Sequence, residues 1–276
     1  MDEHIVEAMG KSKVVIKNGK VVEVDDPKID YCPLFHEKRG IEKLNKNVVK
    51  ENMEFRITDF GMCSPNRQLK MKDFLSFGIS EILSTLLDEK AIDVVVMVCE
   101  GCGTVLITET SKIQGIGGRV SGLVKTSPIP EVIKRIGKEN VLNIEDANIN
   151  QYKGVQLAIV KGYKNIAVTL ASGIGGEKLR QLEKDNQNVN IYLFSVHSTG
   201  VDHYEAENIF KYCDVVTACA SKSIRSIGSK KAYLEVGNSI PIFAASENGK
   251  KFIEMRLKKI GKKNKKGKPN PPKPLI

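Results

Sequence analysis

Apolar and polar residues follow two different periods along the chain. From residue 73 to 88 the apolar residues recur at helical spacing, and Asp73 can cap the first turn. A continuous apolar run from Ala91 to Val98 comes next, which is typical of a parallel strand covered on both faces. This pattern predicts a helix that leads directly into a buried strand.

The second half of the chain alternates regularly between the two periods. We expect helices at 153–162, 177–184, 204–212 and 247–260, and strands at 165–170, 189–194, 214–219, 232–236 and 240–244. Helices and strands that alternate at this spacing indicate βαβ units. We therefore predict an α/β fold with a mainly parallel, Rossmann-like sheet.

The N-terminal part has a different pattern. Two β-rich runs in residues 13–24 flank Asn18-Gly19, a pair that tolerates the positive φ of a hairpin turn. A helical pattern follows at 41–53, and Pro130 opens a further helix through Ile136. We predict an N-terminal hairpin segment at 1–60, packed on an α/β domain at 61–260.

Composition places the chain among globular proteins. It has 276 residues, of which 41% are hydrophobic and 28% charged, enough for one large domain or two small ones. No apolar run of about 18 residues is present, and the acidic N-terminus does not resemble a signal peptide. We expect a cytoplasmic protein without a membrane partner, whose six cysteines are reduced.

The net charge of +10 is mostly local. Nine Lys or Arg residues and no acid lie from Arg256 onward, so the rest of the chain carries about +1. Residues 261–276, with four prolines among lysines, are predicted to be a disordered basic tail. Nucleic-acid binding is not expected except through this tail, which alone supports a third functional class, an RNA or ribosome accessory protein.

Four cysteines lie beside Pro, Gly or Ser rather than within regular apolar runs. They are Cys32, Cys63, Cys99 and Cys102. Proline keeps Cys32 out of a helix, and Cys63 lies among turn residues. The Cys-x-x-Cys pair after the apolar run can bind a metal, share an iron-sulfur cluster or form a redox disulfide. We predict a shared metal site, holding an iron-sulfur cluster or zinc, with ordinary core cysteines as the alternative.

Glycine-rich ends of other predicted strands could bind an anion. Gly173, Gly175 and Gly176 precede a helix and could present backbone N–H groups, and Gly-Ile-Gly-Gly recurs at 115–118. Neither copy matches a phosphate or dinucleotide fingerprint, so tight turns are the alternative.

Other candidate side chains have weaker support. Cys219 could reach the same edge of the sheet, although core packing is the favoured interpretation for both Cys213 and Cys219. His197 could be a proton shuttle or a fourth ligand, and His203 and His36 have the same standing, with a surface position as the alternative.

Several long and unusual sequence segments make the chain similar to a known protein family. They are residues 31–36, residues 54–63, residues 73–82, the segment ending at Cys99–Thr104, and residues 114–119. Through them the chain resembles the archaeal family called methanogenesis marker protein 8, over nearly all of its length except the basic tail. The resemblance implies a protein that accompanies the methane-forming pathway, with other methanogenesis proteins as partners, and brings no catalytic residues with it.

Two functions follow from these observations. The first is a metal or iron-sulfur protein that assists archaeal methanogenesis by maturing or reductively activating an enzyme or its cofactor. The alternative is a small-molecule enzyme that binds a phosphorylated or carboxylated ligand at the glycine-rich edge, with Cys99 as nucleophile or redox thiol. The residues leave open whether the protein is an enzyme.

Overall fold

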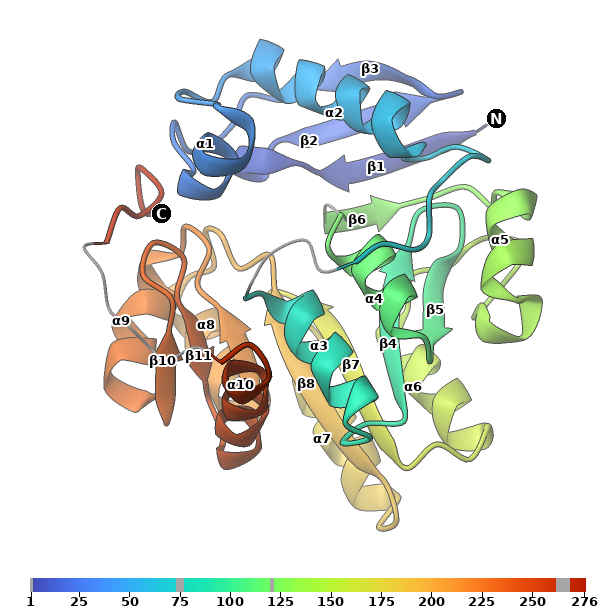
Figure 1. Ribbon diagram of the computed structural model, residues 1–276, viewed down its shortest axis with the longest axis vertical. Helices are drawn as coiled ribbons and strands as arrows, with labels where there is room; N and C mark the ends of the chain where they lie inside the picture. The colour runs from blue at the N-terminus through green and yellow to red at the C-terminus, as the bar shows by residue number, and fades with distance from the viewer. Residues whose placement is uncertain (1, 73–76, 120–121, 262–268) are drawn as a thin grey trace.

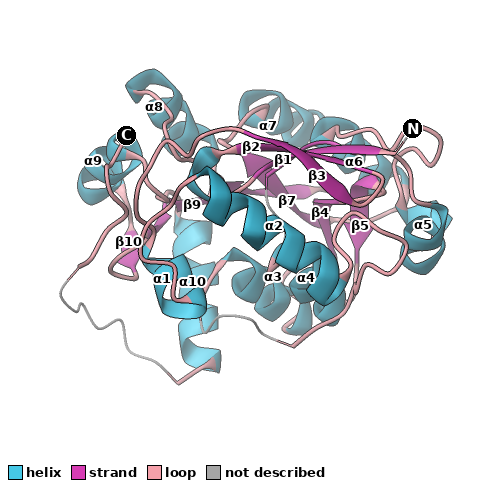
Figure 2. Ribbon diagram, turned by 90° about the horizontal axis from the view of Figure 1, so that it is seen from above, coloured by secondary structure: helices cyan, strands magenta, loops and turns pink. Residues whose placement is uncertain are grey.

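The computed structural model describes residues 2–72, 77–119, 122–261 and 269–276. Within these residues, a four-stranded sheet lies across one end of a seven-stranded sheet, as Figures 1 and 2 show from two sides. Helices accompany both sheets. The protein is therefore of the mixed α/β class, as the alternating pattern predicted.

The large sheet has the strand order β10-β11-β9-β8-β7-β4-β5 in the described part of the chain. The neighbouring pairs β4/β7, β7/β8 and β8/β9 are parallel, and the remaining pairs are antiparallel. The strands are β4 (Val94–Cys99), β5 (Gly103–Ile107), β7 (Asn165–Ala171), β8 (Asn190–Val196), β9 (Val215–Thr217), β10 (Leu234–Val236) and β11 (Ile242–Ala244).

Helices cover both faces of this sheet (Figure 1). One face carries α3 (Ile79–Asp88), α4 (Thr110–Gly117), α5 (Pro130–Ile136) and α10 (Glu247–Lys259). The other carries α6 (Gln151–Val160), α7 (Gly176–Asp185), α8 (His203–Tyr212) and α9 (Lys222–Lys231). Short 3-10 turns lie at η1 (Met9–Lys11) and η2 (Lys138–Asn140). No helix in the described residues is long and apolar enough to cross a membrane.

Strand β4 explains the continuous apolar run. Val94 and Val96 pack into the core under α6 and α7, whereas Val95 and Met97 pack into the core under α3 and α10. Because successive side chains of a strand point to opposite faces, a strand buried on both sides has no polar positions. The prediction of a buried strand here is confirmed.

The prediction of a mainly parallel, Rossmann-like sheet is wrong at both edges. At one edge, β4 turns directly into antiparallel β5 through a tight turn in which Gly101 and Gly103 have φ of 80° and 68°. A Cβ at Gly103 would lie 2.1 Å from the Ala147 carbonyl oxygen, so only glycine fits there. At the other edge, β11 pairs antiparallel with both neighbours. At the first edge the return is a tight turn. At the second edge α9 connects β9 to β10, and a short return then inserts β11 between them.

The small sheet has the order β3-β2-β1-β6 within the described residues. Its strands are β1 (Glu3–Glu7), β2 (Lys13–Lys17), β3 (Lys20–Val24) and β6 (Gly122–Lys125). The predicted hairpin is confirmed, with Asn18 and Gly19 both at positive φ between β2 and β3. The pattern did not predict β1 and β6. Since β6 comes from the middle of the chain, the N-terminal segment is completed by a distant strand, and the boundary at residue 60 stays a prediction.

Two helices accompany the small sheet, α1 (Pro33–Arg39) and α2 (Lys46–Phe60). The helix predicted at 41–53 is α2, which begins later because the Asn45 side chain accepts from the Val48 N–H and caps it. Apolar side chains of α2 and of β1 to β3 form one core cluster, which includes Val49, Met53 and Ile16.

Two further predictions need correction, and one helix was missed. The helix predicted at 73–88 begins at Ile79 in the structure, and residues 73–76 lie outside the described part. The segment 115–118 forms the end of α4 rather than a separate turn, and Gly115 lets that helix approach the backbone of Leu69. Helix α9 was not predicted.

The predicted disordered tail is wrong for residues 269–276. The Lys273 carbonyl accepts from the N–H groups of Asp30 and Tyr31, and Lys273 N–H donates back to the Tyr31 carbonyl. Ile276 exchanges two backbone hydrogen bonds with the segment that starts α9, at Ala220 and Lys222. Residues 262–268 lie outside the described part of the chain. The end of the chain therefore ties the small-sheet layer to the large sheet.

Candidate functional site

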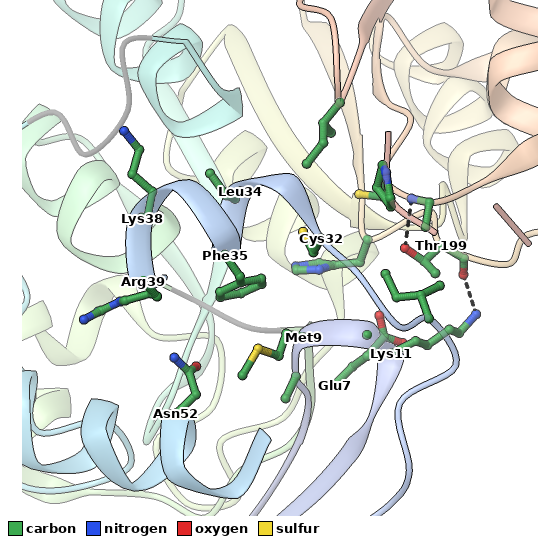
Figure 3. A pocket seen from close by; sticks show the side chains of 18 of the residues that line it. Glu7, Met9, Lys11, Cys32, Leu34, Phe35, Lys38, Arg39, Asn52 and Thr199 are labelled. Atoms are coloured by element: carbon green, nitrogen blue, oxygen red, sulfur yellow. Dashed lines mark hydrogen bonds between the residues drawn. The ribbon is translucent and has the colours of Figure 1, made fainter. Parts of the chain in front are cut away.

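A pocket of about 390 Å³ lies between the small-sheet layer and the carboxyl ends of β8 and β9. Its walls come from β1 and η1, from α1 and α2, and from the segments after β8 and β9 (Figure 3). Open α/β sheets hold ligands at this end of their strands, and the volume suits a small molecule.

One end of the pocket is strongly basic. Lys38, Arg39, Arg56 and Arg119 line it with Asn52, and Asp59 is the acid among them. Burial lowers the pKa of Arg56 to about 10. The Glu100 charge opposes this shift, while the charges of Arg67 and Arg39 act in the same direction as burial. Burial and the charge of Arg67 also lower the pKa of Arg119. Both guanidinium groups stay charged at neutral pH, so an anion that enters here relieves their repulsion.

Phe60 holds these guanidinium groups together. The Cζ atoms of Arg67 and Arg119 each lie 4.8 Å from the centroid of its ring, and that of Arg56 lies 5.7 Å away. Arg56 also donates to the Arg119 carbonyl, which connects α2 to the end of α4. Cation–π contact and this hydrogen bond keep like charges close before any ligand binds.

The other end of the pocket contains thiols. Cys32 precedes α1, and Cys219 lies between β9 and α9; both are partly exposed and both line the pocket. Burial raises the pKa of the Cys32 thiol, and the charge of Cys219 adds to this, while the backbone N–H groups of Phe35 and Leu34 oppose it. Cys219 Sγ donates weakly to Thr217 Oγ1 at 3.7 Å.

His197 and Lys11 complete this wall. Burial, followed by the charge of Arg56, lowers the pKa of His197 to about 4, so its imidazole is neutral at pH 7. Lys11 Nζ donates to the Thr199 carbonyl at 2.6 Å and joins η1 to the loop after β8. Burial raises the pKa of Glu7 on the same wall.

The backbone is unusual where three adjacent parallel strands end. Ser172, His197 and Cys219 follow β7, β8 and β9, and their φ angles are 49°, 54° and 43°. Non-glycine residues rarely adopt this left-handed region, and such residues gather at ligand sites where the fold holds them. Two of the three line the pocket.

A second polar cluster is buried beside the β4–β5 turn. Arg67 Nε lies 3.1 Å from Glu100 Oε2, and both side chains are 0% exposed. Arg67 Nη2 and Glu100 Oε1 have no hydrogen-bond partner among the described residues. Burial, and then the Glu100 charge, raises the pKa of Cys63 well above its usual value.

The structure divides the four predicted metal-binding cysteines. Cys99 and Cys102 lie side by side, and their mutual hydrogen bond, with burial, raises the pKa of Cys99 well above its usual value. Cys63 is buried near Glu100, whereas Cys32 lines the pocket. The described residues contain no group of three or more His, Cys, Asp or Glu side chains arranged to hold a metal ion. The shared metal site stays a prediction to which this arrangement adds no support.

The predicted glycine-rich edge lies outside the pocket lining. The turn before α7 packs closely against α8. A Cβ at Gly173 would lie only 2.6 Å from the Ile209 side chain. Gly175 caps α7 in the left-handed conformation, and Gly176 is buried against Tyr212. The role of Gly173, Gly175 and Gly176 in binding stays a prediction.

Sequence reasoning named some pocket residues and missed others. Cys32, Cys219 and His197 were candidates, because they follow strands or precede a proline. Cys213 is a core residue, and His203 is exposed on α8. The arginines were missed, since an arginine within a helical pattern looks like a solvated surface residue. The segment Glu54–Cys63, which contains Arg56 and Phe60, is one of the unusual segments that carry the family resemblance, and it could have indicated these arginines.

This chain is similar to known proteins of archaea. Residues 4–258 match a family described as an uncharacterized protein conserved in archaea (DUF2099). The chain belongs to this archaeal family. It is also similar to an uncharacterized protein of Methanocaldococcus jannaschii, with 46% identity over 265 residues that cover 95% of this chain and 93% of that protein. The family match includes both sheets and most of the pocket, and ends before the docked segment 269–276.

Proposed function

We propose that this family member binds a multiply charged organic anion in the pocket between the two sheets. The observation that carries the proposal is the arginine cluster on Phe60, whose members Arg56 and Arg119 line a cavity of small-molecule size. Arg39 lines the same cavity, with its guanidinium over the Phe55 ring. Guanidinium groups bind carboxylate and phosphate through paired hydrogen bonds, and their strength grows in a partly desolvated site. The ligand class is a polycarboxylate or a phosphate-bearing molecule.

Calorimetric titration tests the proposal with citrate and pyrophosphate as probes. Arg119→Gln should weaken binding roughly tenfold, which corresponds to about 1.4 kcal/mol, as expected for one charge-assisted contact. Lys178→Gln, which removes an exposed positive charge on α7 away from the pocket, is the matched control and should leave affinity unchanged. Equal losses of affinity in both variants would mean that binding depends only on the net charge of the protein, and would overturn the proposal.

The functional context remains a second proposal. Membership of an archaeal family is consistent with the resemblance to methanogenesis marker protein 8, and a role in methane formation with other methanogenesis proteins as partners follows only from that resemblance. Its test is a growth phenotype: deletion of the gene in a methane-forming archaeon should slow methane production, and an Arg119→Gln copy should fail to restore it.

The metal or iron-sulfur hypothesis is tested separately, by anaerobic purification with metal and sulfide analysis. If Cys32, Cys63, Cys99 and Cys102 share a centre, replacing any one with Ser should lower both metal content and stability, because ligation couples to folding. Cys213→Ser should lower only stability, since Cys213 is buried in the core. Metal content that survives Cys32→Ser would remove that residue from the site.

A further inference from the structure

All six cysteines lie in the described residues, and their exposure separates them. Cys63, Cys99, Cys102 and Cys213 are buried, while Cys32 and Cys219 are partly exposed. The two thiols that solvent can reach both line the pocket that contains the arginine cluster. Far apart in the sequence, they are brought to one cavity by the contact between the two layers.

The two thiols are presented differently. Cys32 comes from the small-sheet layer, in extended conformation directly before α1, where the N–H groups of Leu34 and Phe35 meet its sulfur. Such N–H groups stabilise a thiolate once it forms. Cys219 comes from the large sheet, at positive φ on the sharp turn between β9 and α9. A strand-to-helix turn of this kind exposes a nucleophile above a sheet.

The two sulfurs are close enough to influence each other. Both side chains line the same pocket, and a negative charge on Cys219 opposes ionisation of Cys32. Cys32 and Ala220, the neighbour of Cys219, also pack in the same core cluster. Two thiols that share one cavity can act in succession on one ligand.

We infer that Cys32 and Cys219 form a dithiol that reduces a small disulfide carrying anionic groups. This inference rests on the proposed function, because the arginine end would hold the anionic part of the ligand while its sulfur–sulfur bond reaches the thiol end. The two thiols in the same cavity therefore specify the ligand further: it is an anion that contains a disulfide bond.

The chemistry balances without a metal or an external oxidant. One cysteine loses its proton to solvent and its thiolate attacks a substrate sulfur, so that a mixed disulfide forms and the first thiolate leaves. The second cysteine then attacks the protein sulfur of the mixed disulfide and releases the second thiolate. The substrate gains two electrons and ends as two thiols, while the protein ends with a Cys32–Cys219 disulfide. A dithiol reductant returns the protein to its starting state.

The buried pair Cys99–Cys102 does not compete for this role. Both side chains are 0% exposed, and the pKa of Cys99 is raised well above its usual value by the hydrogen bond with Cys102 and by burial. A thiol that solvent cannot reach and that resists ionisation exchanges slowly.

The test uses 5,5′-dithiobis(2-nitrobenzoate), a disulfide with two carboxylates, on the full chain reduced beforehand. We expect release of two thionitrobenzoate ions per protein, and intact mass and peptide mapping that show a Cys32–Cys219 disulfide with no bound probe. Cys219→Ser should release one ion and retain the probe on Cys32, and Cys213→Ser should behave like the wild type. A wild-type protein that carries the probe on both cysteines would overturn the dithiol.

A neutral disulfide, 4,4′-dithiodipyridine, separates this inference from the proposed function. Arg119→Gln should slow the reaction with the dicarboxylate probe about tenfold and leave the neutral probe unaffected. If the internal disulfide forms but both probes react at unchanged rates, the anion site is wrong and the dithiol stands. If citrate binds but no internal disulfide forms, the dithiol is wrong and the anion site stands. Circular dichroism checks that each variant is folded. If a variant unfolds, the intact mass and peptide map of the reacted wild-type protein alone test whether the Cys32–Cys219 disulfide forms.

Discussion

Two sets of cysteines in this protein lie in opposite environments. Cys32 and Cys219 meet solvent in a basic pocket, whereas Cys63, Cys99 and Cys102 are enclosed beside the Glu100–Arg67 ion pair. The enclosed set contains the Cys-x-x-Cys motif, and the pocket set contains two cysteines far apart in the sequence. Thiol chemistry depends on access, and here access favours the pair without a motif.

The enclosed set should be the more sensitive to mutation. Glu100→Gln leaves the Arg67 charge buried without its partner, and we expect the free energy of unfolding to fall by about 3–5 kcal/mol. Urea denaturation of the variant and the wild type measures this. The double variant Arg67→Met/Glu100→Gln should recover part of the loss, since no unpaired charge remains. A loss below about 1 kcal/mol for the single variant would mean that solvent reaches this cluster, and the contrast between the two sets would disappear.

Removal of residues 269–276 should affect the pocket set more than the enclosed set. Pro272 lines the pocket, and the segment forms backbone hydrogen bonds at Tyr31 and Ala220, beside the two pocket cysteines. We expect a loss of about 2 kcal/mol in unfolding free energy, because each such bond contributes about 1 kcal/mol net and ordering entropy offsets part of the sum. Thiol labelling should speed up more at Cys32 and Cys219 than at Cys99, which is fully buried and reacts only when the fold opens. Unchanged stability would show that the segment is not docked.

Acid should weaken the fold through His197. Its pKa is about 4 in the folded protein and about 6.5 in an unfolded chain, so between these values the unfolded chain binds more protons. Stability should therefore be complete above about pH 6.5 and fall as pH drops toward 4, by on the order of 2 kcal/mol for this partly exposed ring. Urea denaturation at pH 7 and pH 4.5 should show a smaller acid loss in His197→Asn than in the wild type. Equal losses would place the imidazole in solvent rather than in the pocket wall.

The smallest effect should come from the predicted glycine-rich edge. Gly175 has φ of 86° with open space around it, so Gly175→Ala should cost about 1 kcal/mol from backbone conformation alone. Since Gly175 is not among the pocket-lining residues, citrate affinity should not change. A calorimetric loss of citrate binding in a folded variant would restore the glycine-rich edge as the anion site and displace the arginine cluster.

Local patterns in the sequence determined much of the secondary structure. The hairpin at Asn18-Gly19, the buried strand β4 and the helices and strands from α6 to α8 follow from periodicity and turn residues, which depend on near neighbours. The proline after Cys32 predicted that this residue lies outside a helix, in an extended or turn segment, and its φ of −132° agrees. The pattern also placed Cys219 at the end of a predicted strand and His197 beyond the end of another.

Only the tertiary structure decided which of these residues form a site. No local signal says that β6 joins the small sheet, that β5 returns antiparallel at the edge, or that segment 269–276 docks beside Ala220. These long-range pairings bury the Cys-x-x-Cys turn, bring Arg119 onto the Phe60 ring of α2, and place Cys32 and Cys219 in the lining of one pocket. Burial and charge convergence arise from contacts between distant segments, so a single sequence supplies the candidate residues while packing selects among them.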